Sequence, residues 1–100
     1  MLNIKKYKTQ LEKICIDLKL KKIDLFGSAV SEKFNDNSDV DMLVEFEIFE
    51  NENFFDKYFE LKTRLENLFN RPVDIVIEHA IKNPFFKQSV EKTRKNIYAA

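Results

Sequence analysis

The fold is decided by residues 21–48, which read KKIDLFGSAVSEKFNDNSDVDMLVEFEI. Residues 21–26 predict a β-strand that ends at Gly27, the only glycine in the chain, and residues 39–48 predict a second strand after a polar loop. In the second strand every even-numbered position is apolar, whereas the odd-numbered positions carry mostly acids. Because successive side chains point to opposite faces of a strand, one face belongs to the core and the other is mostly acidic.

The remainder of the chain supplies helices and a further strand. Apolar residues recur at spacings of three and four in the long predicted helices, and Asn83-Pro84 has the form of an N-cap followed by proline. Helices are predicted at residues 4–18, 28–33, 54–69 and 84 to about 95, and a third strand at residues 73–78. This order predicts an α/β (α+β) fold in a single domain, residues 1–100. We expect a small mixed sheet with long helices on one face and the aspartates on the open face.

Composition excludes several classes of protein. The 17 basic and 17 acidic side chains leave no net charge, so no basic field attracts nucleic acid and we expect no direct nucleic-acid binding. No apolar run approaches the roughly 20 residues that a membrane span needs, and no signal core follows the N-terminal lysines. The single cysteine, Cys15, cannot form an intramolecular disulfide, which fits a reducing compartment. We therefore expect a cytoplasmic protein without membrane contact.

Three aspartates are the candidate catalytic and metal-binding residues. Asp39 and Asp41 are two residues apart on one predicted strand, so their carboxylates share a face, and Asp74 lies on the polar face of another strand. If these strands are neighbours, the three carboxylates converge. Two unit charges at 4 Å repel by about 4 kcal/mol at an effective dielectric constant of 20, so the groups must take up protons or bind a cation. Mg²⁺ fits, because it shares its oxygen ligands between one or two carboxylates and substrate phosphates. The simpler alternative is a solvated acidic face.

Gly27 and Ser28 are the candidate nucleotide-binding residues. A glycine at a strand-to-helix turn lets a ligand approach the backbone closely. The N–H groups that begin the following helix, together with the Ser28 hydroxyl, could then receive a phosphate. The alternative at this position is an ordinary turn in which Ser28 caps a helix.

The combined pattern is Gly-Ser, ten residues, Asp-x-Asp and a third Asp on a later strand. It resembles the DNA polymerase β-like nucleotidyltransferase superfamily, and the length and helix placement resemble its minimal nucleotidyltransferase (MNT) branch. The resemblance implies that Gly27 and Ser28 hold the terminal phosphates of the nucleotide and that Asp39 and Asp41 bind two Mg²⁺ ions. Asp74 would complete the ion nearest the attacking hydroxyl. In this superfamily the α-phosphorus is attacked and pyrophosphate leaves.

The resemblance also implies a partner. MNT proteins are commonly encoded beside a HEPN-domain ribonuclease toxin, whose antitoxin they are. The implied activity is therefore that of a protein adenylyltransferase, which transfers AMP from ATP to a protein hydroxyl such as a tyrosine of the HEPN toxin.

Two other functions are compatible with the sequence. Many relatives carry Arg-Gly where this chain has Ser31-Glu32, so an antitoxin that neutralises its partner by direct contact, with weak or no catalysis, is one alternative. A transferase acting on a small molecule such as an aminoglycoside is the other, although relatives of that kind usually carry an additional C-terminal domain. Two minor expectations concern other residues: His79 lies at a strand end without a metal, and the pairs Phe54-Phe55 and Phe85-Phe86 belong mainly to the core.

Overall fold

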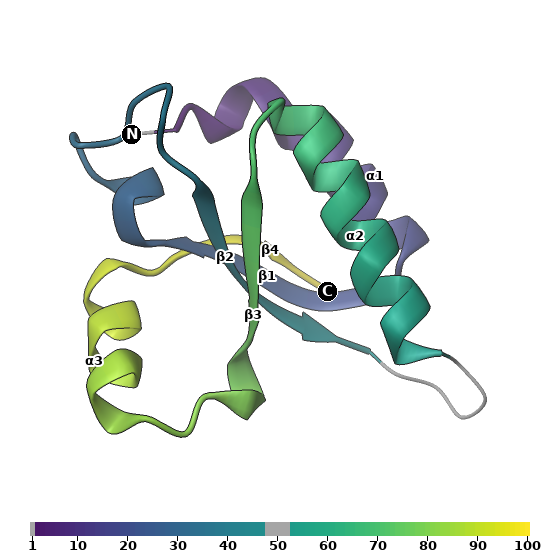
Figure 1. The fold of residues 1–100 in the computed structure, drawn as a ribbon. Coiled ribbons are helices and arrows are strands. Elements are labelled where there is room, and N and C mark those ends of the chain that lie inside the picture. Colours follow the sequence, from purple (N-terminus) through teal and green to yellow (C-terminus); the bar gives the residue numbers. More distant parts are fainter. Residues whose placement is uncertain (1, 48–52) are drawn as a thin grey trace.

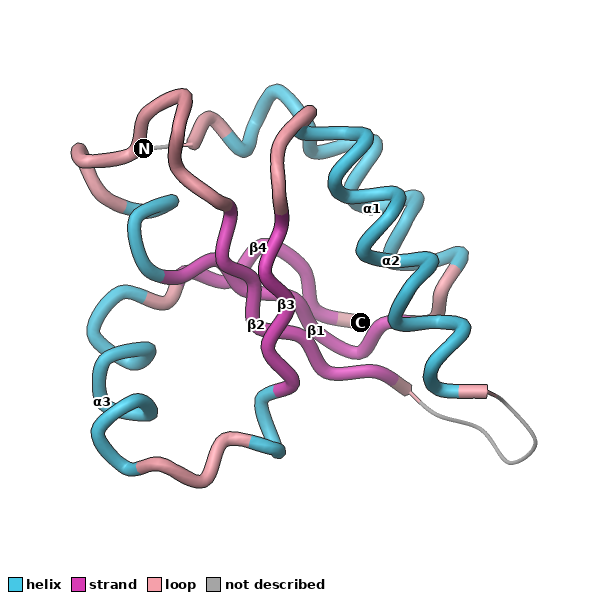
Figure 2. The backbone as a smooth tube through the Cα atoms, viewed as in Figure 1, coloured by secondary structure: helices cyan, strands magenta, loops and turns pink. Residues whose placement is uncertain are grey.

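The computed structural model describes residues 2–47 and 53–100, which form a four-stranded mixed sheet flanked by helices (Figures 1 and 2). The strands are β1 (Leu20–Phe26), β2 (Val40–Phe46), β3 (Val73–Ile77) and β4 (Lys95–Ala99), and their order in the sheet is β3-β2-β1-β4. The helices are α1 (Lys8–Asp17), α2 (Phe54–Phe69) and α3 (Pro84–Thr93), with short 3-10 turns at η1 (Ile4–Tyr7), η2 (Gly27–Val30) and η3 (Glu78–Ala80). The predicted fold class is confirmed.

The directions of the strands follow from their connections. β1 and β2 are antiparallel, whereas β2 and β3 are parallel because α2 carries the chain back across the sheet between them. Asn53 begins α2 by accepting hydrogen bonds from two backbone N–H groups, and Asn70 ends it in the left-handed conformation with φ of 54°. The crossover therefore starts and stops at residues suited to those ends.

The main core lies between one face of the sheet and the helices α1 and α2 (Figure 1). The even-numbered residues of β2 point into this core, as their alternation predicts. Leu11, Ile14 and Cys15 of α1 and Leu61, Leu65 and Phe69 of α2 cover them. Burial of so many aliphatic side chains on one face leaves the odd-numbered residues of β2 on the other.

The aspartate face is only partly open, which differs in detail from the expected arrangement. α3 crosses this face on the side opposite α1 and α2 (Figure 1), and its Val90 packs with Phe26 and Leu43 in a second, smaller core. Leu43 is the one apolar residue among the odd positions of the predicted strand, so α3 covers the face where that residue offers an apolar contact. The face remains accessible at the end that carries Asp39, Asp41 and Asp74.

Strand β4 is absent from the sequence prediction, which extended the last helix to about residue 95. The helix ends at Thr93, and residues 95–99 pair antiparallel with β1. A short segment with two half-buried residues, Ile97 and Tyr98, has little periodicity of its own, and its strand conformation comes from a partner some 70 residues earlier. The predicted end of the second strand at residue 48 lies outside the described residues.

Candidate active site

The three aspartates lie on one face of the sheet, at the same end of two neighbouring strands. Asp41 of β2 and Asp74 of β3 are register partners in the parallel pair, so their side chains stand next to each other. Asp39 immediately precedes β2 and is two residues from Asp41, which puts it on the same side. Asp39 and Asp74 are exposed, whereas Asp41 is half-buried between its neighbours. The structure therefore brings Asp41 and Asp74 together, and Asp39 is near enough for its charge to act on Asp41.

The electrostatics of this group are unfavourable without a counter-ion. Burial, followed by the negative charge of Asp74, a hydrogen bond to Asp74 and the charge of Asp39, raises the pKa of Asp41 to about 6. The hydrogen bond between the two carboxyl groups requires a proton, which Asp41 supplies when it is protonated. Above that pH the pair carries adjacent negative charges, and a bound cation would relieve their repulsion.

Gly27 is packed directly against this group. Its φ is +69°, a conformation that other residues adopt only with strain, and a Cβ at this position would lie 2.7 Å from Oδ2 of Asp41. Only glycine therefore allows the turn after β1 to approach the carboxylate so closely. Ser28 follows at the start of η2 and is half-buried beside it. The turn that carries the two predicted nucleotide-binding residues thus meets the aspartates at Asp41.

Thr93, the last residue of α3, fixes the glycine turn. The backbone N–H of Gly27 donates a hydrogen bond of 2.9 Å to Oγ1 of Thr93. The expected phosphate seat at the start of the short helix therefore has one N–H fewer than an unpaired turn would offer. The donors that remain for a phosphate at this turn are the backbone N–H groups after Gly27 and the Ser28 hydroxyl.

Arg71, in the connection between α2 and β3, holds the loop that leads to Asp39. Its Nη1 donates to the backbone carbonyls of Asn35, at 2.8 Å, and Ser38, at 2.9 Å, while its guanidinium lies over the Phe34 ring at 4.4 Å. The next residue after Ser38 is Asp39, so Arg71 positions a candidate ligand without touching it.

A buried ion pair secures α3 on the aspartate face. Asp24 is only 2% exposed, and its Oδ2 accepts hydrogen bonds from Nε and Nη2 of Arg94 at 2.9 and 2.6 Å. Asn96 donates to the other carboxylate oxygen at 2.8 Å. Because Arg94 directly follows Thr93, this pair also fixes the hydroxyl that holds Gly27.

The chemistry of Mg²⁺ indicates how the aspartates could hold metal ions. Within the described residues, no group of three or more His, Cys, Asp or Glu side chains encloses a metal position by itself. That agrees with the chemistry of Mg²⁺, which keeps much of its shell for water and substrate phosphate and takes one or two carboxylates from the protein. Asp41, whose pKa is raised, and the neighbouring Asp74 offer the oxygen donors that such an ion needs, and the glycine against Asp41 presents no Cβ to a phosphate.

The other residues considered in the sequence analysis lie outside the site. His79 lies in η3 and contacts Glu45, with Nδ1 3.0 Å from Oε2. Cys15 is buried, and burial raises the pKa of its thiol to about 12, which makes it an inert core residue. The expectation that the Phe pairs lie mainly in the core is wrong for three of the four rings: Phe55, Phe85 and Phe86 are exposed, at 69%, 80% and 39%.

The sequence pattern did not predict three residues that position the site, Thr93, Arg71 and Arg94. Each acts through a contact between segments that are 33 to 70 residues apart in the chain. No local spacing reports such a contact. The sequence offered one hint, the position of Arg71 directly before Pro72 and a predicted strand. This position indicates a loop, but it does not indicate which residues Arg71 contacts.

Comparison with known proteins gives consistent matches over most of the chain. Residues 8–97 match the family model described as "Nucleotidyltransferase domain". "Putative protein adenylyltransferase MJ0128" of Methanocaldococcus jannaschii is 43% identical over 74 residues, which are 74% of this chain and 72% of that protein.

Solved structures share the whole fold. One described as a "putative minimal nucleotidyltransferase" superposes with a TM-score of 0.73 at 26% identity and covers 95% of both chains. Another, a toxin-antitoxin with AMP-PNP, superposes with a TM-score of 0.68 at 25% identity and covers 93% of this chain and 73% of that one. Within residues 2–47 and 53–100, no helix has the length and apolar character to cross a membrane.

Proposed function

Because the chain belongs to the nucleotidyltransferase domain family, we propose that it is a protein adenylyltransferase that transfers AMP from ATP to a hydroxyl group of a partner protein. The observation that carries this proposal is the side-by-side placement of Asp41 and Asp74 against Gly27. A relative 43% identical bears the same activity in its name, and the chain covers 72% of that relative. The whole activity is assigned to a single minimal domain, residues 1–100.

The three aspartates hold two Mg²⁺ ions in this proposal, and Gly27 and Ser28 receive the terminal phosphates. When bound, the ions neutralise the charge of the phosphates and of the developing oxyanions. The raised pKa of Asp41 supports this assignment, since a carboxyl group that is costly to ionise in the free protein gains most from a cation. The closeness of Gly27 to Asp41 supports the second part, because a phosphate there meets no Cβ.

The chain's own residues then orient the reaction. The acceptor oxygen attacks the α-phosphorus, a new P–O bond forms, and the bond to the β-phosphate breaks so that pyrophosphate leaves. Asp74 stands at the edge strand β3 and accepts the proton of the acceptor hydroxyl. Gly27 and Ser28, on the β1 side of Asp41, hold the leaving pyrophosphate.

We further propose that the acceptor is a tyrosine of a HEPN-domain toxin and that the protein is the corresponding antitoxin. A toxin-antitoxin with AMP-PNP shares the fold at a TM-score of 0.68, and the MNT resemblance of the sequence points to the same partner. A neutral net charge and a site rich in carboxylates fit a protein acceptor better than nucleic acid. The reaction takes place in the cytoplasm, away from membranes.

Two observations favour the second function, neutralisation by direct contact. Phe55 and Phe59 are one helical turn apart on α2 and are 69% and 60% exposed, which is unusual for large apolar side chains. Ser31-Glu32 also removes the basic residue that many relatives place near the phosphates. An antitoxin that binds without catalysis would need an exposed apolar surface and would tolerate the loss of a basic residue near the phosphates.

Label transfer distinguishes the two functions. The purified chain is incubated with Mg²⁺, ATP labelled at the α-phosphate and the protein encoded beside it, with Asp41→Asn as the site variant and Asp36→Asn, in the exposed turn, as the matched control. Catalysis predicts label on the partner with the wild type and the control and none with Asp41→Asn. No label on any protein, together with full neutralisation of the partner by Asp41→Asn, would show that contact alone is the mechanism.

A further inference from the structure

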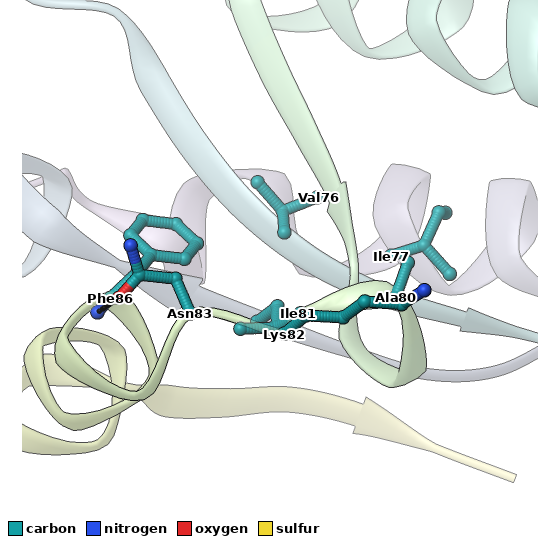
Figure 3. A pocket seen from close by; sticks show the side chains of 7 residues that line it. All are labelled: Val76, Ile77, Ala80, Ile81, Lys82, Asn83 and Phe86. Carbon is teal, nitrogen blue, oxygen red and sulfur yellow. Dashed lines mark hydrogen bonds between the residues drawn. The ribbon is translucent and has the colours of Figure 1, made fainter.

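A pocket of about 520 Å³ lies beside the candidate active site, between β3 and the start of α3 (Figure 3). Val76 of β3, Ile81 in the connection and Phe86 of α3 provide its apolar lining, and Asn83 and Lys82 stand at its polar side. Its volume is in the range of small-molecule sites, which are commonly about 300–1,000 Å³. Neither the aspartates nor Gly27 belong to its lining, so the pocket is a separate feature of the surface.

Two structural relations nevertheless place the pocket next to the aspartates. Val76 lies two residues beyond Asp74 on β3, so it shares the face of Asp74 and is displaced along the strand by roughly 6.6 Å. On the other side, the Phe86 ring packs edge-to-face against Phe26, with 6.1 Å between centroids. Phe26 is the register partner of Asp41 and directly precedes Gly27.

The geometry of the proposed reaction gives this pocket an occupant. Gly27, Asp41 and Asp74 form a row across the strands, from β1 through β2 to the edge strand β3. If the leaving pyrophosphate lies at Gly27 and the attacking hydroxyl at Asp74, the in-line axis runs along this row. The ribose leaves the α-phosphorus nearly perpendicular to that axis, and the direction along β3 is one that meets this condition. The pocket lies along β3 from Asp74 and begins at Val76, two residues beyond it.

We propose that this pocket holds the nucleobase of the ATP. The inference rests on the proposed function, since it uses the direction of the phosphate chain. Val76 and Ile81 supply aliphatic contacts and Phe86 an aromatic ring, which together suit a flat heteroaromatic base.

Asn83 supplies the polar contact that such a base requires. Its Oδ1 accepts hydrogen bonds from the backbone N–H groups of Phe85, at 2.9 Å, and Phe86, at 3.3 Å, as the N-cap of α3. This fixes the amide and leaves Nδ2 as a donor toward a ring nitrogen of the base. The pocket therefore offers a nucleobase both a surface for stacking and a fixed hydrogen-bond donor. An aliphatic side chain of the acceptor would use only the apolar surface.

Comparison of two ligands distinguishes the contribution of the base to binding from that of the phosphates. The ligands are Mg²⁺-ATP and Mg²⁺-tripolyphosphate, which lacks the nucleoside. Their affinities are measured by calorimetry for the wild type and for Phe86→Ala, with Phe85→Ala as the matched control. Phe85 is the neighbouring exposed ring of α3, at 80%, and does not line the pocket. Because Phe86 also packs on Phe26, Ile81→Ala provides a second variant from another part of the chain, and circular dichroism verifies the folding of each.

The proposal predicts that Phe86→Ala weakens ATP binding roughly tenfold, in line with the loss of a stacked base, and that Ile81→Ala weakens it several-fold. Tripolyphosphate binding should be unchanged in both variants, and Phe85→Ala should behave as the wild type with both ligands. Unchanged ATP affinity in Phe86→Ala and Ile81→Ala would overturn the proposal, as would an equal loss for both ligands. An unchanged ATP affinity with a raised KM for the acceptor protein would assign the pocket to the acceptor instead. ATP binding with the predicted pattern but no AMP transfer would refute the proposed function and leave the base pocket standing.

Discussion

Replacing Asp41 by asparagine should make the metal-free protein more stable while it removes the proposed activity. The pKa of Asp41 is raised from its ordinary value of 3.8 to about 6, chiefly by burial and by the charge of Asp74. The folded protein therefore resists ionisation of this group, and at neutral pH the ionised carboxylate is a source of instability. Asparagine has nearly the same shape, carries no charge, and can still donate a hydrogen bond to Asp74.

The size of the effect follows from the same difference. About two pH units correspond to about 3 kcal/mol at ~1.4 kcal/mol per unit. Asp41 is only half-buried and solvent screens part of the repulsion, so we expect a gain of about 1–2 kcal/mol at pH 7.5 in the presence of EDTA. For a domain of 100 residues, each kcal/mol raises the midpoint of thermal unfolding by about 4–8 °C.

The pH dependence has a definite sign. Below about pH 4 the carboxyl group is protonated in both the folded and the unfolded chain, so it contributes no difference. Between about pH 4 and 6 only the folded chain keeps the proton, and the free energy of unfolding of the wild type falls as the pH rises. Asp41→Asn lacks this group, so its advantage over the wild type should be small at pH 4 and complete above about pH 7.

Thermal and urea unfolding followed by circular dichroism measure both quantities, with Asp36→Asn in the exposed turn as the control for loss of one charge. Addition of Mg²⁺ should raise the unfolding midpoint of the wild type and of the control but not that of Asp41→Asn. The reasoning is refuted if Asp41→Asn is less stable than the wild type at pH 7.5 in EDTA, or if the difference between them is the same at pH 4 and pH 7.

Three further variants test the arrangement around the site. Gly27→Ala should lower the free energy of unfolding by about 1–2 kcal/mol and abolish AMP transfer, because φ is +69° and the new Cβ would lie 2.7 Å from a carboxylate oxygen. AMP transfer near the wild-type rate would contradict the close approach. Arg71→Ala should lower kcat for transfer about tenfold because the loop before Asp39 loses two carbonyl contacts, with Arg71→Lys intermediate; equal rates in all three proteins would exclude a positioning role. Arg94→Ala should cost about 3 kcal/mol in urea unfolding, because the buried Asp24 loses two charge-assisted hydrogen bonds and keeps only Asn96 and the more distant Lys22. A loss below 1 kcal/mol would show that this pair does not secure α3.

Local pattern was enough to predict the main elements and the convergence of the aspartates. The even positions of β2 alternate so regularly that the core face, and hence the side of Asp39 and Asp41, follows from period two alone. The position of Asp74 required one further assumption, that its strand lies next to β2. That assumption holds because α2 has the length and the apolar stripe of a crossover helix, which favours a parallel neighbour.

The missed features depend on contacts that no window of sequence contains. β4 is a strand because β1 offers it an edge, and α3 lies over the aspartate face because Leu43 and Phe26 give it an apolar contact there. The rings of Phe55 and Phe85 show the converse: both lie in the first turn of an amphipathic helix, yet both are exposed. Hydrophobicity predicts that a side chain can be buried, and only packing decides whether it is.

The central claim is that the row of carboxylates and the glycine turn bind divalent cations and a triphosphate together. Crystals grown with Mn²⁺ and a non-hydrolysable ATP analogue test it directly, because the anomalous scattering of manganese marks each ion. The account predicts peaks among Asp39, Asp41 and Asp74 with the phosphate chain lying along Gly27 and Ser28. Nucleotide bound elsewhere, or manganese absent from these aspartates while nucleotide is present, would contradict it.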